Sequence, residues 1–188
     1  MHFSAPESSE KCGRFNPPGG KIAVWYAADS ALTAMAESYG RMFHFAGTIS
    51  WPESALDQHY ICAVKVIRTV KVIDVVRLCE LLHIPLDSLE NENYDFPQWL
   101  MSQLFCLKNN HAGIAYSSRH CRYKKCYAFW KNPESAHAFK DVSQGRVTIR
   151  NYREYDTQLF PPGWKLRWMK GDDMLERLLN FAIVPEPD

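Results

Sequence analysis

The chain has 188 residues, of which 46% are hydrophobic and 13% aromatic, and its formal net charge is +1. This length and apolar content predict a single domain, residues 1–188, with a substantial core. The small net charge excludes a global field that would recruit nucleic acid or an anionic membrane. Residues 1–11 lack the apolar run of a secretory signal, and no apolar stretch approaches the roughly 20 residues that span a bilayer. The six cysteines form no Cys-x-x-Cys pair, so we expect reduced thiols in a cytoplasmic protein.

The first forty residues predict a loop, a strand and a helix in that order. The Pro-Pro-Gly-Gly run at residues 17–20 cannot continue a helix, so the opening segment is expected to be a loop. The apolar run at residues 22–28 predicts a strand. Ser30 predicts the N-cap of a helix that runs to about Tyr39 and ends near Gly40. Its apolar residues follow the spacing of one buried stripe: Leu32, Met35, Ala36 and Tyr39.

The rest of the chain predicts strands and helices that interleave irregularly. This irregular order favours an α+β fold over a regular parallel sheet. The expected elements are strands at 60–67 and 70–75 (or one bent strand), a helix at 76–82, a polar loop at 87–93, a helix at about 96–107 capped by Asp95, strands at 113–116, 126–130, 146–152 and 165–169, and a last helix at 174–181 capped by Asp172 and Asp173.

Three polar residues in these elements are candidates for chemistry, although each has an ordinary explanation when taken alone. Arg14 in a loop is most simply a solvated charge, Glu37 a solvated helix residue, and Ser118 a turn residue. Glu37 also lies in the last turn of its helix, where the negative end of the helix dipole disfavours a carboxylate by a few tenths to about 1 kcal/mol. Arg41 is placed to offset that cost through an i, i+4 pair.

Taken together, these residues and their flanking sequences resemble the RES domain, a family named after an arginine, a glutamate and a serine. The resemblance extends from about residue 12 to about residue 140. The order and spacing of the motifs make the joint match specific, because any one motif is weak. The matching segments are the Arg14 loop GRFNPPGG at 13–20, the strand VWYAA at 24–28, the AMAE of the Glu37 helix at 34–37, the helix around PQWL at 97–100, the serine segment GIAYSSR at 113–119, and the strand CYAFW at 126–130.

The resemblance implies a fold like that of the ADP-ribosyltransferases, in which two small β-sheets flanked by helices form a cleft for NAD. It implies an enzyme that cleaves the nicotinamide–ribose bond of NAD by hydrolysis or phosphorolysis, acting as a toxin paired with an antitoxin protein. ADP-ribosylation of a protein is the alternative activity. The serine followed by arginine in the family pattern corresponds to Ser118, and Ser117 remains open as the functional serine.

The residue types suit this reaction. We expect NAD to be a substrate and no metal to take part. Nicotinamide departs as a neutral base, so one carboxylate that stabilises the oxocarbenium-like ribose can suffice, and Glu37 is the candidate. Arg14 offers a planar guanidinium to the pyrophosphate, and Ser118 can orient the ribose or the nucleophile. Tyr26 can stack on the nicotinamide ring, or it can simply face the core.

Three other interpretations remain open. Basic residues mixed with aromatic residues at 119–125 and 164–170 can hold single-stranded nucleic acid, although a solvated hairpin loop explains the first segment better. A metal site is weaker, because the spacing of His111, His120, Cys121 and Cys126 fits no zinc pattern. The chain can also be a module that binds NAD without turning it over.

Overall fold

The computed structural model describes residues 3, 5–8, 12–20, 22–40, 49–107, 110–121 and 123–186. These residues form two compact units, each built from two separate stretches of the chain. The first unit comprises Met1–Asp29 and Val66–Lys140, and the second comprises Ser30–Lys65 and Asp141–Asp188. No helix of the described ranges is both long and apolar enough to cross a membrane.

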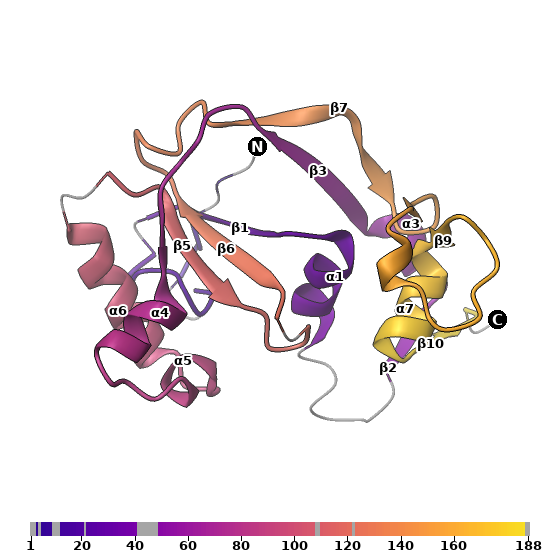
Figure 1. Ribbon diagram of the computed structural model, residues 1–188, viewed down its shortest axis with the longest axis horizontal. Coiled ribbons are helices and arrows are strands. Elements are labelled where there is room, and N and C mark those ends of the chain that lie inside the picture. The colour runs from indigo at the N-terminus through magenta and orange to yellow at the C-terminus, as the bar shows by residue number, and fades with distance from the viewer. Residues whose placement is uncertain are drawn as a thin grey trace. The chain divides into compact units, whose positions relative to one another are not determined.

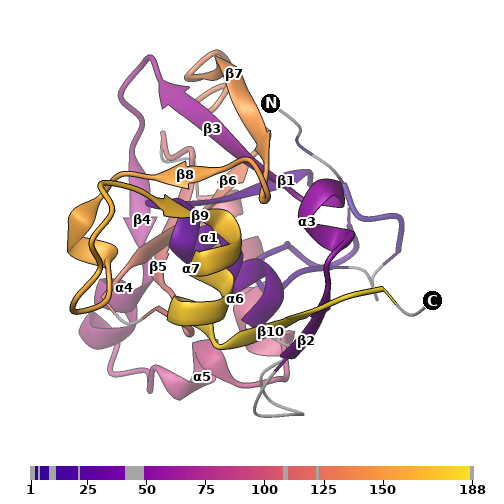
Figure 2. The same cartoon turned by 90° about the vertical axis from the view of Figure 1, so that its right-hand side faces the viewer.

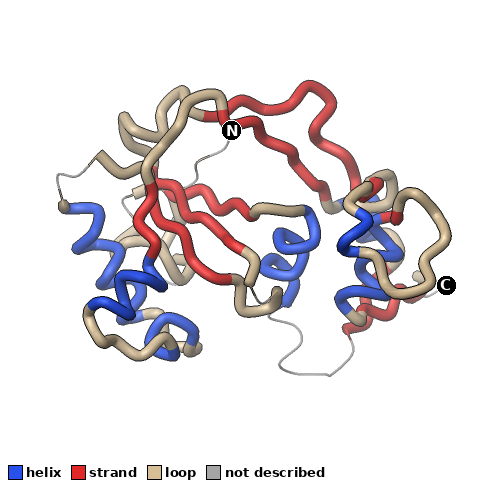
Figure 3. The backbone as a smooth tube through the Cα atoms, in the orientation of Figure 1, coloured by secondary structure: helices blue, strands red, loops and turns tan. Residues whose placement is uncertain are grey.

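The first unit contains a four-stranded sheet in the order β1-β6-β5-β4, drawn in Figures 1 and 3. Strand β6 is antiparallel to both of its neighbours, whereas β4 and β5 run parallel. Three helices lie between β4 and β5 in the sequence of this unit. The elements are β1 (Val24–Ala28), β4 (Val72–Asp74), α4 (Val75–Leu81), α5 (Asp87–Glu90), α6 (Asp95–Cys106), β5 (Gly113–Ser117) and β6 (Lys125–Trp130).

One face of this sheet packs against α4 and α6. Side chains alternate between the two faces of a strand, so Ile114 and Tyr116 of β5 point to the same face. Both are buried in a single apolar cluster with Val75 of α4 and Met101 of α6, which are fully buried. Phe15, from the loop before β1, joins the same cluster and lies 4.4 Å from Tyr116 between ring centroids. The loop that carries Arg14 is therefore anchored in the core of the first unit.

The second unit contains three two-stranded sheets and short helices. Strand β10 pairs in parallel with β2, and Figure 2 shows the two side by side. Strand β3 pairs with β7, and β8 pairs antiparallel with β9. Most residues of β3 and β7 belong to this unit. The elements are α1 (Ala31–Tyr39), β2 (Ile49–Pro52), α3 (Ala55–Gln58), β3 (Tyr60–Val66), β7 (Phe139–Thr148), β8 (Arg153–Glu154), the 3-10 helix η3 (Thr157–Leu159), β9 (Met169–Lys170), α7 (Gly171–Leu179) and β10 (Phe181–Val184).

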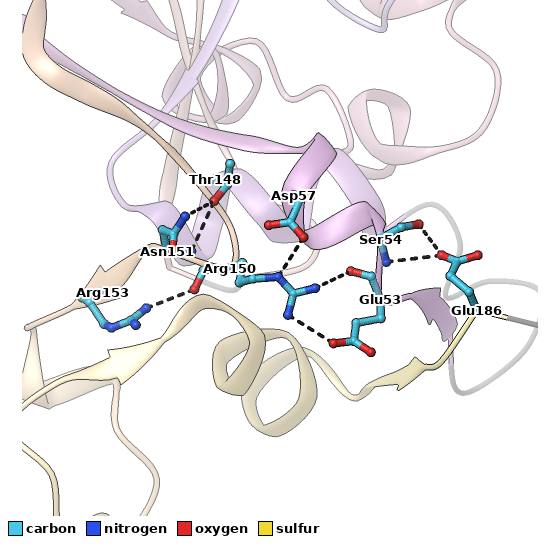
Figure 4. Close-up of polar contacts among 8 residues, drawn as sticks. All are labelled: Glu53, Ser54, Asp57, Thr148, Arg150, Asn151, Arg153 and Glu186. Carbon is cyan, nitrogen blue, oxygen red and sulfur yellow. Dashed lines mark hydrogen bonds and ion pairs between the residues drawn. The ribbon is translucent and has the colours of Figure 1, made fainter.

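An ion-pair network links α3 of the second unit to the segment after β7. The Arg150 guanidinium donates to Asp57 Oδ2 at 2.8 Å and to Glu53 Oε1 at 3.2 Å, and it also reaches the Glu53 carbonyl at 3.1 Å (Figure 4). In the same view Ser54 donates to the carboxylate of Glu186, beyond β10. Because these groups are well exposed, each pair contributes little to stability.

Most of the elements expected from the sequence are present. Ser30 is the N-cap of α1, and its hydroxyl accepts a hydrogen bond from the Thr33 amide at 3.2 Å. Gly40 is the C-cap with ordinary right-handed backbone angles. Met35 and Ala36 of the expected stripe are buried, whereas Leu32 and Tyr39 are half-buried.

Several boundaries differ from the expectation, and part of one expected loop is a helix. The 87–93 segment is not wholly a loop, because 87–90 form α5. Tyr94, not Asp95, is the N-cap of α6, and the last helix begins at Gly171. That helix ends at Asn180, whose left-handed φ of 55° turns the chain into β10. The expected strands at 146–152 and 165–169 are present only as far as Thr148 and from Met169.

Candidate functional site

Arg14 lies in a closed turn at the start of the first unit. The Asn16 amide donates to the Gly13 carbonyl at 3.1 Å, which is the i to i+3 bond of a β-turn. The Gly13 amide in return donates to Asn16 Oδ1 at 3.0 Å. Arg14, Phe15 and Asn16 are 8%, 2% and 5% exposed. The sequence-based view of Arg14 as a solvated charge is therefore wrong, because its turn is buried.

Aromatic rings surround the guanidinium of Arg14. Its Cζ atom lies 5.5 Å from the ring centroid of Phe15 and 5.8 Å from that of Tyr94, the N-cap of α6. Ring faces attract cations, so these contacts favour the charged group in a mostly desolvated position. A planar guanidinium fixed in this way is suited to bidentate contact with an anion such as a phosphate group.

Tyr26 of β1 is bonded to the Arg14 turn through its hydroxyl group. The Phe15 amide donates to Tyr26 Oη at 3.0 Å, and Tyr26 Oη donates to Asn16 Oδ1 at 2.8 Å. The Tyr26 side chain is nevertheless 39% exposed, so it is not a plain core residue. Stacking of its ring on nicotinamide stays a prediction.

Ser118 directly follows β5 and is 4% exposed. Its hydroxyl oxygen accepts hydrogen bonds from the backbone amides of His120 at 3.2 Å and Cys121 at 2.9 Å. Its own amide donates to the Lys124 carbonyl at 2.9 Å. Ser118 therefore shapes the loop between β5 and β6.

Ser117 differs from its neighbour in both exposure and surroundings. It is exposed and lines a cavity of about 280 Å³ together with Asp74, Arg77 and Lys125. Lys125 Nζ lies 3.1 Å from Asp74 Oδ2. Burial raises the pKa of Asp74, but hydrogen bonds from the Arg77 amide and from Lys125 outweigh it and hold that pKa below its usual value.

Glu37 lies on α1 in the second unit, whereas Arg14, Tyr26 and Ser118 all lie in the first. The Glu37 side chain is half-buried, in the last turn of its helix as expected. That turn contains no basic residue, and Arg41 lies outside the described residues. Convergence of Glu37 with the other three groups in one cleft stays a prediction.

The sequence analysis quoted two residues of this site without giving them a role. Asn16 closes the turn around Arg14, and Gln98 of α6 donates its side-chain amide to the Gly13 carbonyl at 3.3 Å. Asparagine is a common turn residue, so a turn at Asn16 is predictable from the sequence. The contact of Gln98 could not, because 85 residues separate it from Gly13.

The basic segment at 119–125 forms the loop of the β5–β6 hairpin, as the simpler interpretation predicted. Arg119 donates to the Glu90 carbonyl at 2.6 Å, Tyr123 is 97% exposed, and Arg122 lies outside the described residues. In the second segment, Trp164 donates its indole hydrogen to the Trp168 carbonyl at 3.1 Å. Across the described ranges, no three His, Cys, Asp or Glu side chains lie close enough together to hold a metal ion.

Comparison with known proteins gives a family match and a structural match. The model of the RES domain matches residues 2–150. No curated protein matches the sequence. Among solved structures, a chain from the crystal structure of the M. tuberculosis MbcT-MbcA toxin-antitoxin complex is similar with a TM-score of 0.57 and 16% sequence identity, over 79% of this chain and 78% of that chain. At this identity the likeness concerns the fold alone, and it confirms the expected α+β class.

Proposed function

Since the chain belongs to the RES domain family, we propose that it is an enzyme that consumes NAD by cleaving the bond between nicotinamide and ribose. We further propose that it acts as the toxin of a toxin–antitoxin pair. The similarity to a chain of a toxin-antitoxin complex supports a protein partner of this kind. The whole chain, residues 1–188, is proposed to act as one domain, with NAD as its substrate and no metal.

The observation that best supports an NAD site is the burial of Arg14 within a closed turn. Arg14 is 8% exposed and its guanidinium lies over two aromatic rings, so its position is set before any ligand arrives. Pre-organised cations bind phosphate oxygens with little further loss of entropy. We assign Arg14 to the pyrophosphate of NAD, which is the one doubly anionic group of that molecule.

Glu37 is the proposed stabiliser of the ribose cation. As the glycosidic bond stretches, positive charge moves from the nicotinamide ring to the ribose, and a carboxylate bonded to a ribose hydroxyl lowers the energy of that state. The leaving nicotinamide is neutral and needs no proton, so no second carboxylate is required as a general acid. A half-buried glutamate is compatible with this role, because it is partly shielded from water yet can reach a ligand.

Ser118 is proposed to orient the ribose or the attacking group through its hydroxyl group. The attacking group is water in a glycohydrolase and inorganic phosphate in a phosphorylase. A protein side chain as the acceptor would make the enzyme an ADP-ribosyltransferase. The bond between nicotinamide and ribose is broken with each of the three acceptors, so each reaction releases nicotinamide.

The test is product analysis of purified protein incubated with NAD, with and without phosphate. We expect nicotinamide together with ADP-ribose, or with ADP-ribose-1″-phosphate when phosphate is the acceptor. Glu37→Gln is expected to lower kcat by roughly 100-fold or more, the usual loss for a group that stabilises transition-state charge. Arg14→Lys keeps the charge but loses the bidentate geometry, so it should raise KM more than it lowers kcat.

Two results would contradict the proposal in different ways. Tight NAD binding without nicotinamide release would indicate a binding module. No binding at all would exclude NAD as the substrate. Oligonucleotide binding with a steep salt dependence would favour the nucleic-acid interpretation. Expression toxicity relieved by Glu37→Gln would support the role of a toxin.

A further inference from the structure

We propose that the hydroxyl group of Tyr26 is a positioning group for Arg14, which it holds in place by fastening the turn of residues 13–16 to strand β1. This inference rests on the proposed function, in which Arg14 binds the pyrophosphate of NAD. Tyr26 would then contribute through its oxygen atom, whether or not its ring also stacks on a ligand.

The Tyr26 hydroxyl is bonded to the two residues that follow Arg14 in the turn. It accepts the Phe15 amide hydrogen at 3.0 Å and donates its own hydrogen to Asn16 Oδ1 at 2.8 Å. Asn16 Oδ1 also accepts the Gly13 amide hydrogen at 3.0 Å. One hydroxyl and one side-chain oxygen therefore satisfy two of the backbone amides in a buried turn, where unpaired amides are costly.

The turn is also closely fitted around this hydroxyl. A Cβ atom added at Gly13 would lie 2.8 Å from Tyr26 Oη and 3.0 Å from Asn16 Oδ1. On its other side the Gly13 carbonyl accepts hydrogen bonds from the Asn16 amide and from Gln98 of α6. The turn is thus fixed to β1 by Tyr26 and to α6 by Gln98, and Arg14 lies between Gly13 and the anchored ring of Phe15.

This arrangement separates the role of the hydroxyl from that of the ring. Phenylalanine at position 26 keeps a ring that can stack and removes only the atom that bonds to the turn. A purely stacking residue would tolerate this change, whereas a positioning residue would not. Weakening the hold on Arg14 should reduce the affinity for any ligand that carries the pyrophosphate, including one without nicotinamide.

The experiment compares the wild-type protein with Tyr26→Phe by two measurements. The first is the Kd of ADP-ribose, which carries the pyrophosphate and lacks nicotinamide. We expect it to rise about 10-fold, with the KM for NAD rising similarly and kcat changing less than 3-fold. The second is hydrogen exchange of the Phe15 amide in the free protein, which should become at least 10-fold faster. Neither measurement requires the enzyme to turn over NAD.

Tyr127→Phe is the matched control, since Tyr127 lies on the neighbouring strand β6 and its hydroxyl makes no hydrogen bond to any part of the chain that the structure describes. It should leave both measurements unchanged. Asn16→Ala should also raise the Kd of ADP-ribose, because it removes the bonds of Asn16 Oδ1 to Tyr26 and to the Gly13 amide. The double variant should lose less than the sum of the two single variants, because the two residues share the bond between them.

The possible outcomes distinguish this inference from the proposed function. An unchanged Kd for ADP-ribose in Tyr26→Phe would overturn the positioning role, even if the Phe15 amide exchanged faster. Unchanged exchange at Phe15 would overturn the hydroxyl's hold on the turn. If the wild-type protein neither bound ADP-ribose nor released nicotinamide, the proposed function would fail, and the exchange measurement would still decide whether Tyr26 holds the turn.

Discussion

The hydroxyl oxygen of Ser118 accepts a hydrogen bond from the Cys121 backbone amide at 2.9 Å, so the residue that is the candidate catalytic serine also supports a turn. Its neighbour Ser117 is exposed and lines a cavity together with charged side chains. The two serines therefore differ in surroundings although they are adjacent in the chain.

Replacing each serine by alanine should separate these roles. Ser118→Ala is expected to lower kcat for nicotinamide release by about 100-fold and to reduce the free energy of unfolding by about 1 kcal/mol through two unpaired amides. Ser117→Ala should keep at least half of the activity and the full stability. Steady-state kinetics and urea denaturation measure both effects. A larger loss of activity in Ser117→Ala than in Ser118→Ala would reverse the assignment.

Gly13→Ala should disturb the Arg14 turn, because the added methyl group would meet the Tyr26 hydroxyl at 2.8 Å. Overpacking of this kind costs about 1–3 kcal/mol of stability. The double variant Gly13→Ala/Tyr26→Phe should recover part of the loss, since the hydroxyl is gone while the Tyr26 Cζ position remains 3.2 Å from the new atom. Thermal unfolding of the three variants measures this coupling. If the double variant is as unstable as the sum of the single ones, the clash is not with the hydroxyl.

Asp74→Ala should destabilise the first unit, because Asp74 is the N-cap of α4 and accepts the Arg77 amide hydrogen at 3.1 Å. The expected loss is about 1 kcal/mol. Asp74→Asn keeps an acceptor oxygen and should lose less, while Lys125→Met tests the exposed ion pair separately and should cost at most about 1 kcal/mol. Equal losses in the alanine and asparagine variants would contradict the capping role.

The Asp74 carboxylate should also make the stability of the protein fall at acid pH. The pKa of Asp74 is lower in the folded protein, so its contribution is present above the pKa of the unfolded state, about 4, and is lost as pH falls through the folded pKa. The difference in stability between wild type and Asp74→Ala should therefore shrink at acid pH. A constant difference from neutral to acid pH would show that the charge of Asp74 does not contribute.

Two tyrosines of the second unit should make stability fall at alkaline pH. Burial, followed by a hydrogen bond to Glu154, raises the pKa of Tyr152, and burial raises that of Tyr39. The unfolded chain then releases these protons first, so the full free energy of unfolding is present below a pH of about 10. It falls as the pH rises through the folded pKa values, by at most about 1.4 kcal/mol per pH unit for each group. Solvent screening of half-buried hydroxyls reduces this limit.

Tyr152→Phe tests the larger of these two effects. It removes the titrating hydroxyl and the 2.9 Å hydrogen bond to Glu154 Oε2. The variant should be less stable than wild type near neutral pH and should lose stability less steeply above pH 10, as measured by urea denaturation over a pH series. Parallel curves for the two proteins would exclude Tyr152 as the source of the alkaline slope.

Several features of the fold were predictable because they depend on neighbouring residues. The capping of α1 by Ser30, the β5–β6 hairpin around residues 118–124 and the first-turn proline of α6 follow from contacts within a few residues. The misjudged elements depend on distant partners. Strand β10 forms against β2, more than 130 residues away. The sequence predicted no strand there, only a last helix that reaches Phe181, the first residue of β10.

The sequence by itself determined the family, the order of most strands and helices, and the residue types that suit cleavage of NAD, because motif order and local hydrogen-bonding preferences are written into adjacent residues. Only the tertiary structure decided that Arg14 is buried instead of solvated, and that the Tyr26 hydroxyl and the Gln98 amide fasten its turn from two different elements. Those contacts join residues 10 to 85 positions apart. Burial and packing bring them together, and no local pattern encodes which distant polar group will satisfy a given buried amide.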